Sequence, residues 1–268
     1  TTLTYAALAR RVERIALGLA ALGVQPGEVV SFQLPNWWQY PALYLACVRI
    51  GAVANPLMPI FRQRELRYML NFAESRVVIV PARYRDFDYA AMLAEIRPDL
   101  TTVRHGFVVG GEGAQSFERH FLERAWEQEA DARALFAARR PDPNALTELL
   151  YTSGTSGEPK AVMHVSNTLL AMALRYIDWV RLTPRYVVFM ASPLAHQTGF
   201  VYGMTIPVVL GTTLVLQDVW SAPDAARLIQ AEGATFTMAS TPFLSDLAGN
   251  EAVTREAVKT LRTFVCAG

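Results

Sequence analysis

Tyr151-Thr152-Ser153-Gly154-Thr155-Ser156-Gly157-Glu158-Pro159-Lys160 is the stretch that decides how this 268-residue chain is interpreted. It combines glycines, which free the backbone, with four Ser and Thr hydroxyls and one ammonium group. Converging N–H groups, hydroxyls and a fixed cation form a concavity suited to a polyphosphate. In P-loop NTPases the lysine directly follows a glycine and opens a helix, whereas here a proline precedes Lys160. We favour a phosphate loop of another type over the alternative, a plain flexible turn.

Predicted strands and helices alternate before this loop. Residues 4–22 place apolar side chains on one helical face, with Thr4 as the cap and Gly23 as the stop. Residues 28–34 and 76–80 are predicted strands that are apolar on both faces. Such strands are typical of a parallel sheet covered by helices, so the fold class is α/β with mostly parallel sheets flanked by helices.

The alternation continues beyond the loop, with further strands predicted at 161–165, 186–190, 213–216, 235–239 and 263–266.

A proline-rich junction, Pro141-Asp142-Pro143-Asn144, divides the chain in sequence. Neither proline can continue a helix, so this segment is expected at the surface. We therefore expect two α/β lobes, residues 1–140 and residues 141–268, the second beginning with the phosphate loop.

Composition excludes several classes of protein. The chain has 52% hydrophobic and 18% charged residues, as in a globular protein, and its 25 basic and 24 acidic residues give a net charge of +1. That balance predicts neither nucleic-acid binding nor a polybasic membrane anchor. Charged and polar residues interrupt the apolar runs, so no transmembrane segment is expected. Cys47 and Cys266 lie in apolar stretches and are predicted to be buried thiols, which favours a cytoplasmic location.

The 151–160 loop resembles the signature of the AMP-binding, adenylate-forming superfamily, which includes acyl-CoA synthetases, firefly luciferase and peptide-synthetase adenylation domains. The usual form is Tyr-Thr-Ser-Gly-Thr-Thr-Gly-x-Pro-Lys-Gly-Val-x-His. This chain matches it through Lys160 with Ser156 for Thr, departs at Ala161, and regains it at Val162 and His164.

Weaker resemblances follow in the family's order. They include residues 51–57 (Gly-Ala-Val-Ala-Asn-Pro-Leu) and residues 193–200 (Pro-Leu-Ala-His-Gln-Thr-Gly-Phe), the latter beside the acyl pocket in the family. Ala195 replaces the common Phe there, which indicates room for a wider or ring-containing acid. The resemblance implies stacked, mostly parallel sheets, as in the large N-terminal domain of acyl-CoA synthetases.

The resemblance also implies two sets of site residues. From the residues alone, His196 fits a core histidine satisfied by a backbone carbonyl as well as a pocket residue, and the resemblance favours the pocket. No catalytic residue and no metal ligand is expected within the chain. The phosphate set is Thr152, Ser153, Gly154, Thr155, Ser156, Gly157 and Lys160, and the acyl or adenylate set is His196, Thr198, Gly199, Ala267 and Gly268.

In this family a carboxylate attacks the α-phosphorus of ATP, pyrophosphate leaves, and CoA then displaces AMP from the acyl-adenylate. The resemblance implies ATP, Mg²⁺ and CoA as substrates or cofactors, with a fatty or alicyclic acid as substrate. The chain stops before the family's later motifs and C-terminal domain, so we expect it to be inactive alone. A carrier-protein-loading adenylation domain and a non-catalytic nucleotide-binding module remain alternatives, and a homodimer stays open.

Overall fold

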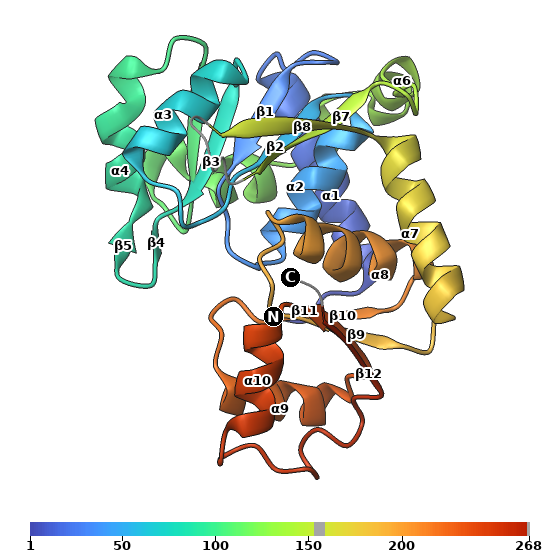
Figure 1. Ribbon diagram of the computed structural model, residues 1–268. Helices are drawn as coiled ribbons and strands as arrows, with labels where there is room; N and C mark the ends of the chain where they lie inside the picture. Colours follow the sequence, from blue (N-terminus) through green and yellow to red (C-terminus); the bar gives the residue numbers. More distant parts are fainter. Residues whose placement is uncertain (153–158, 267–268) are drawn as a thin grey trace. The chain divides into compact units, whose positions relative to one another are not determined.

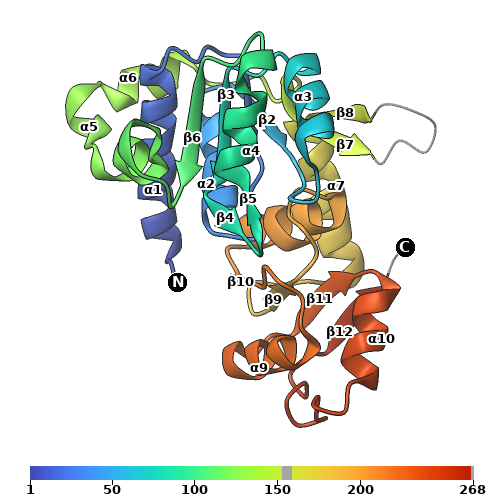
Figure 2. The ribbon, with the colours of Figure 1, turned by 90° about the vertical axis from the view of Figure 1, so that its left-hand side faces the viewer.

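The computed structural model describes residues 1–152 and 159–266 (Figures 1 and 2). The chain divides into two compact units, Thr1–Ser166 and Asn167–Gly268. This boundary differs from the expected one at residue 140, because β7 (Leu146–Thr152) pairs with β2 (Val53–Pro56) and so joins the first sheet. Each unit is an α/β structure, which confirms the predicted fold class.

The first unit is built on a six-stranded sheet in the order β6-β3-β1-β2-β7-β8. Its strands are parallel except β8, which runs antiparallel to β7 at the edge. A two-stranded ribbon and short helical segments complete the unit. Its elements are α1 (Tyr5–Ala21), β1 (Val29–Phe32), α2 (Gln39–Arg49), β2, α3 (Gln63–Phe72), β3 (Val77–Pro81), β4 (Arg83–Tyr84), β5 (Phe87–Asp88), α4 (Tyr89–Ile96), β6 (His105–Val109), a π-helical segment (Glu118–Glu123), α5 (Trp126–Glu129), α6 (Ala132–Ala138), β7 and β8 (Lys160–Val165).

Helices cover both faces of this sheet because its central strands are apolar on both sides. All residues of β1 and β3 are buried. Leu66 of α3 and Ile96 of α4 pack in one core cluster with Val78 of β3. On the other face, Phe32 meets Tyr40 of α2 edge to face, with ring centroids 5.0 Å apart.

The predicted signals of the first helix are confirmed. The hydroxyl of Thr4 accepts a hydrogen bond from the N–H of Ala7 at 3.1 Å, which caps α1. Gly23, with φ of 84°, follows the end of the helix in a conformation that glycine adopts without strain.

The second unit is built on a parallel four-stranded sheet, in the order β10-β9-β11-β12. Its elements are α7 (Ser166–Val180), β9 (Val187–Met190), a π-helical segment (Thr198–Thr205), α8 (Ile206–Leu210), β10 (Thr213–Leu216), α9 (Ala222–Glu232), β11 (Phe236–Ala239), α10 (Thr241–Gly249) and β12 (Thr263–Cys266). Helices α8, α9 and α10 of this unit have proline in the first turn, where the missing N–H has no helical partner.

The two cysteines differ in exposure. Cys47 on α2 is buried, as predicted, but Cys266 is exposed. The prediction for Cys266 is wrong: its strand, β12, has one neighbour, β11, among the described strands, so Cys266 is not covered from the other side by a described strand. None of the helices in the described ranges combines the length and hydropathy that a membrane span requires.

Candidate active site

The β7–β8 hairpin carries the two ends of the predicted phosphate loop. Residues Tyr151 and Thr152 of β7 pair with Ala161 and Lys160 of β8. The antiparallel ladder therefore holds the first and last donors of the motif directly opposite each other. Figure 2 shows the two strands side by side along this hairpin. The predicted phosphate ligands Ser153, Gly154, Thr155, Ser156 and Gly157 lie outside the described residues.

Buried side chains fix the hairpin to the first unit. Leu149, 8% exposed, packs with Val29 and Val53 of the neighbouring strands. The Tyr151 hydroxyl donates a hydrogen bond to the backbone carbonyl of Met69 on α3, at 3.1 Å. Burial raises the pKa of Tyr151, so this hydroxyl keeps its proton and remains a donor. Tyr151 thus ties the end of β7 to α3.

Thr152 and Lys160, by contrast, present their side chains to solvent. The Thr152 hydroxyl lies 3.4 Å from the backbone carbonyl of Lys160, which is a long and weak hydrogen bond. Across the described residues, no carboxylate forms an ion pair with the Lys160 ammonium. An ammonium in this state is available to an anion.

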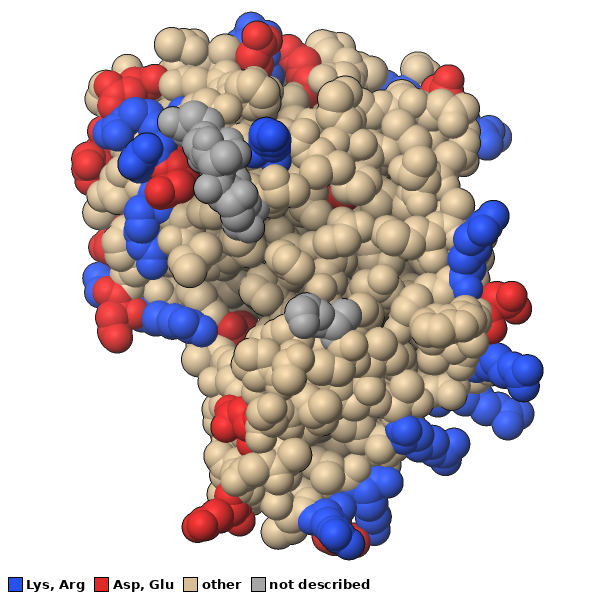
Figure 3. Space-filling view, in the orientation of Figure 1, with Lys and Arg blue, Asp and Glu red and all other residues tan. Residues whose placement is uncertain are grey.

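The charges around the hairpin are mixed. Figure 3 shows Lys and Arg side chains interspersed with Asp and Glu on the face that it draws. This distribution agrees with the near-zero net charge.

The predicted pocket residues His196, Thr198 and Gly199 lie in the second unit, in the bend of residues 193–200. His196 is exposed, so the core reading of this histidine is wrong. The backbone N–H of Thr198 donates to Nδ1 of His196 at 3.2 Å. In the neutral ring this leaves the proton on Nε2, which can donate to a ligand. Ala267 and Gly268, the other predicted pocket residues, lie outside the described part of the chain.

Gly199 is required by packing. A Cβ at this position would lie 2.1 Å from the carbonyl oxygen of Pro193 and 2.8 Å from the nitrogen of Leu194. Both contacts are with backbone atoms, which cannot move aside as a flexible side chain can. Only glycine therefore permits the bend that positions His196.

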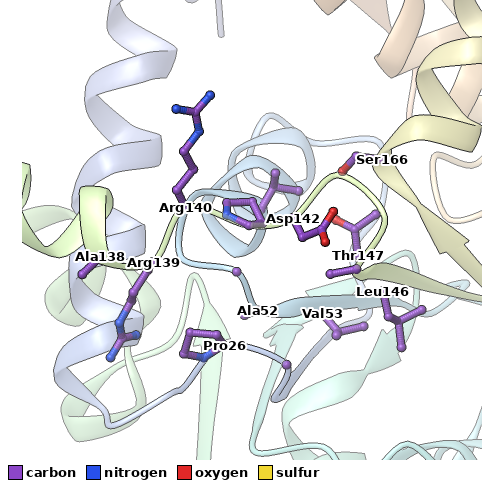
Figure 4. A pocket seen from close by; sticks show the side chains of 15 residues that line it. Pro26, Ala52, Val53, Ala138, Arg139, Arg140, Asp142, Leu146, Thr147 and Ser166 are labelled. Carbon is purple, nitrogen blue, oxygen red and sulfur yellow. The ribbon is translucent and has the colours of Figure 1, made fainter.

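A cavity of about 300 Å³ lies at the opposite end of β7 from the phosphate loop (Figure 4). Leu146 and Thr147, the first residues of the strand, line it together with Val53 at the start of β2. Figure 4 shows the guanidinium of Arg140 extending away from the other labelled side chains. The cavity thus lies at the start of β7, and Thr152 lies at the end of that strand.

Two titratable residues of the hairpin were not assigned a role from sequence. His164 pairs with Glu148 across the two strands, and burial lowers the pKa of His164. Glu148 is fully buried, and desolvation raises its pKa well above its ordinary value. No local signal distinguishes Glu148 in sequence from an exposed strand residue. Its burial depends on the helix that covers it.

A family model described as "AMP-binding enzyme" matches residues 1–268. The chain belongs to the AMP-binding enzyme family. This assignment confirms the resemblance carried by the 151–160 motif. It also agrees with the parallel sheets of the structure.

Individual members of the AMP-binding enzyme family are similar over nearly the whole chain. The medium-chain fatty-acid–CoA ligase of Escherichia coli is 31% identical over 266 residues, which are 99% of this chain and 46% of that protein. A salicylyl-CoA synthase / salicylate adenylyltransferase from Streptomyces is 31% identical over 89% of this chain and 44% of its own length. ATP-bound MatB from Rhodopseudomonas palustris superposes with a TM-score of 0.78 at 25% identity, covering 98% of this chain and 49% of that one. The chain spans about half the length of these relatives.

Proposed function

We propose that the chain is the N-terminal part of an acyl-CoA synthetase. In this proposal the whole protein uses ATP to convert a fatty or alicyclic acid to an acyl-adenylate and then transfers the acyl group to CoA. The observation that carries the proposal is the β7–β8 hairpin, which is anchored through Tyr151 and in which exposed Thr152 and Lys160 flank the family motif in sequence. The CoA ligase and synthase names of its relatives support the acceptor.

The chemistry explains why a donor-rich loop is needed. A carboxylate is a poor electrophile, whereas its mixed anhydride with AMP carries a good leaving group. Pyrophosphate departs with negative charge, so donors that grip the β- and γ-phosphates stabilise the leaving group. Lys160 supplies the positive charge, while Thr152, the hydroxyls and the backbone N–H groups of residues 153–157 supply further hydrogen bonds. Each bond to a charged group contributes about 1.5–3 kcal/mol.

The second unit contributes the acid-binding side in this proposal. His196 is exposed and its Nδ1 accepts a hydrogen bond from Thr198, while Ala195 beside it is 4% exposed. The small Ala195 side chain leaves more space than the phenylalanine common in the family, which favours a wide or ring-containing acid. Ala267 and Gly268 are proposed to contact the adenylate.

No described residue is assigned to Mg²⁺. In the described part of the chain, no group of three or more His, Cys, Asp or Glu side chains is placed to hold a metal ion. We therefore propose no described residue of this chain as a Mg²⁺ ligand. We also propose that this chain alone does not complete the reaction, a point tested by pyrophosphate release.

The phosphate-site assignment of Lys160 can be tested by lysine labelling, because the chain has two lysines. Lys160 and Lys259 are its lysines, and Lys259 lies in the second unit beside Glu256. An acyl-phosphate derivative of ATP delivers its acyl group to a lysine amine near the phosphate site and releases ATP. We expect acylation at Lys160, blocked by excess ATP, with Lys259 unprotected as the internal control. Equal, ATP-insensitive labelling of both lysines would refute the phosphate-site assignment.

A titration measures the energetic contribution of the same lysine. Lys160→Ala is expected to weaken ATP binding by about tenfold or more, the equivalent of one lost charged hydrogen bond. The matched Lys259→Ala variant should bind ATP as the unmodified chain does. In the complete protein, thioester formation is then measured with competing carboxylic acids and with CoA as the acceptor. Thioester formation with CoA separates a CoA ligase from a carrier-loading adenylation domain. ATP binding without any adenylate formation by the complete protein would indicate a non-catalytic module.

A further inference from the structure

The side chain of Glu148 is a buried acid with no hydrogen-bond partner. It is 0% exposed, and both its carboxyl oxygens are buried without a partner in the described structure. A carboxylate in this state is strongly disfavoured, because an unpaired charge has lost its water and gained nothing in return. The side chain is therefore expected to be the neutral carboxylic acid in the folded protein.

Two phenolic side chains lie near this acid. Tyr40 and Tyr44 of α2 lie close enough to Glu148 that its charge would raise the pKa of both hydroxyls. The hydroxyl of Tyr44 also shares a hydrogen bond with the side chain of Thr147. Cys47, one helical turn beyond Tyr44, is a buried thiol whose pKa is raised by desolvation. None of these groups is a cation that would stabilise an ionised Glu148.

The strands on either side add a single ionisable group. Ala54 of β2 is the register partner of Glu148 on one side, and His164 of β8 is its partner on the other. Burial lowers the pKa of His164, which disfavours a charged imidazolium opposite Glu148. The ladder is irregular between Leu146 and Glu148. The hairpin is thus least regular where the acid is buried.

We propose that Glu148 is a positioning residue for the phosphate loop, and that it holds β7 against α2 only as the neutral acid. Thr152, where β7 ends, lies four positions after Glu148. Ionisation would draw the carboxylate toward water and loosen β7 and its partner β8. The loop between them would lose its anchored ends. The link to ATP rests on the proposed function, whereas the link to the hairpin does not.

The sign of the pH dependence follows from the buried acid. The folded protein keeps a proton on Glu148 that the unfolded chain releases above the ordinary value of 4.5. Stability is therefore full below that value and falls as pH rises toward the folded-state pKa. The unfolding equilibrium constant should rise about tenfold per pH unit within this window, relative to a variant without the titration.

The experiment compares the 268-residue chain with Glu148→Gln, a neutral side chain of similar shape. Urea unfolding is measured from pH 5 upward, and hydrogen exchange of β7 and β8 is compared with that of β3 at each pH. We expect the unmodified chain to lose stability and hairpin protection relative to Glu148→Gln as pH rises, with β3 less affected. Glu13→Gln, an exposed glutamate of the same unit, should keep the pH dependence of the unmodified chain.

Several outcomes would overturn the inference. Parallel pH profiles for the unmodified chain and Glu148→Gln would show that Glu148 does not titrate on unfolding. Equal loss of protection in β7, β8 and β3 would show that the effect is not local to the hairpin. Glu148→Met provides a second neutral variant if Gln disturbs folding. If both variants were unfolded at every pH, the carboxylate charge would be required and the inference would be wrong.

The same measurements distinguish a failure of the proposed function from a failure of the Glu148 inference. If the hairpin shows the expected pH response but ATP never protects Lys160 in either protein, the positioning effect stands and the ATP assignment is wrong. If ATP protects Lys160 equally at all pH values while the hairpin loosens, Glu148 does not position the phosphate loop.

Discussion

The β7–β8 hairpin and the segment of residues 193–200 both carry family motifs, but neighbouring atoms restrict them differently. The hairpin is fixed by side chains such as Leu149 and Tyr151, and its terminal residues Thr152 and Lys160 are exposed. In residues 193–200 the restriction is in the backbone, which passes against itself at Gly199. Motif residues therefore differ: Thr152 and Lys160 are exposed at the ends of two strands, whereas Gly199 permits a close approach of the backbone. The variants below are ordered from the largest expected effect on stability to the smallest.

The largest effect is expected for Gly199→Ala. The added Cβ would clash with backbone atoms of Pro193 and Leu194, so the bend must shift. We expect a loss of about 3 kcal/mol in the free energy of unfolding, at the upper end of overpacking effects. Urea denaturation measures this loss. Gly249→Ala is the control, because a Cβ there meets nothing within 4 Å, and equal stability losses would contradict the packing role of Gly199.

Tyr151→Phe removes a single hydrogen bond from the hairpin. The hydroxyl bonds to the carbonyl of Met69, and the ring is otherwise retained in the core. We expect a stability loss of about 1 kcal/mol, since one neutral hydrogen bond contributes that amount. Hydrogen exchange should locate the loss in β7 and α3. An unchanged exchange rate in both elements would indicate that the bond does not anchor the hairpin.

His164→Gln tests the exposed half of the same hairpin through pH. Because burial lowers the pKa of His164 in the folded protein, the unfolded chain binds more protons below the ordinary value of 6.5. Stability is therefore full above that pH and falls as pH decreases. The variant should lack this decrease, by an amount below about 1 kcal/mol, because a half-buried group remains partly screened by water. His120, whose pKa is also lowered, is present in both proteins and cancels in the comparison. Superimposable acid profiles would contradict the assignment.

The smallest effect on stability is expected for Lys160→Ala. Its side chain is exposed and forms no ion pair within the described residues. The free energy of unfolding should change by less than about 0.5 kcal/mol, as for other surface substitutions. A thermal melt without ATP measures this change. A larger loss would mean that Lys160 stabilises the hairpin itself, and would weaken the view that it is reserved for ligand.

Local sequence patterns determined much of the fold and the identity of the candidate loop. Apolar periodicity and the Thr4 cap predicted α1, and continuous apolar runs predicted the buried strands β1 and β3. These signals are local, since a helix face or a buried strand needs only the spacing of its own side chains. The 151–160 motif identified the family for the same reason, because its donors are contiguous.

Tertiary structure decided the features that depend on distant residues. The unit boundary follows Ser166 because β7 pairs with β2, a strand about 90 residues earlier, and proline spacing carries no information on that pairing. Cys266 is exposed on β12, which is the last of the described strands in its sheet. Glu148 is buried because α2 covers it, and no neighbouring residue in the sequence predicts that burial. The burial favours the protonated form of its carboxyl group. The sequence specified the donors of the loop, and only the packing of strand on helix determined what holds them.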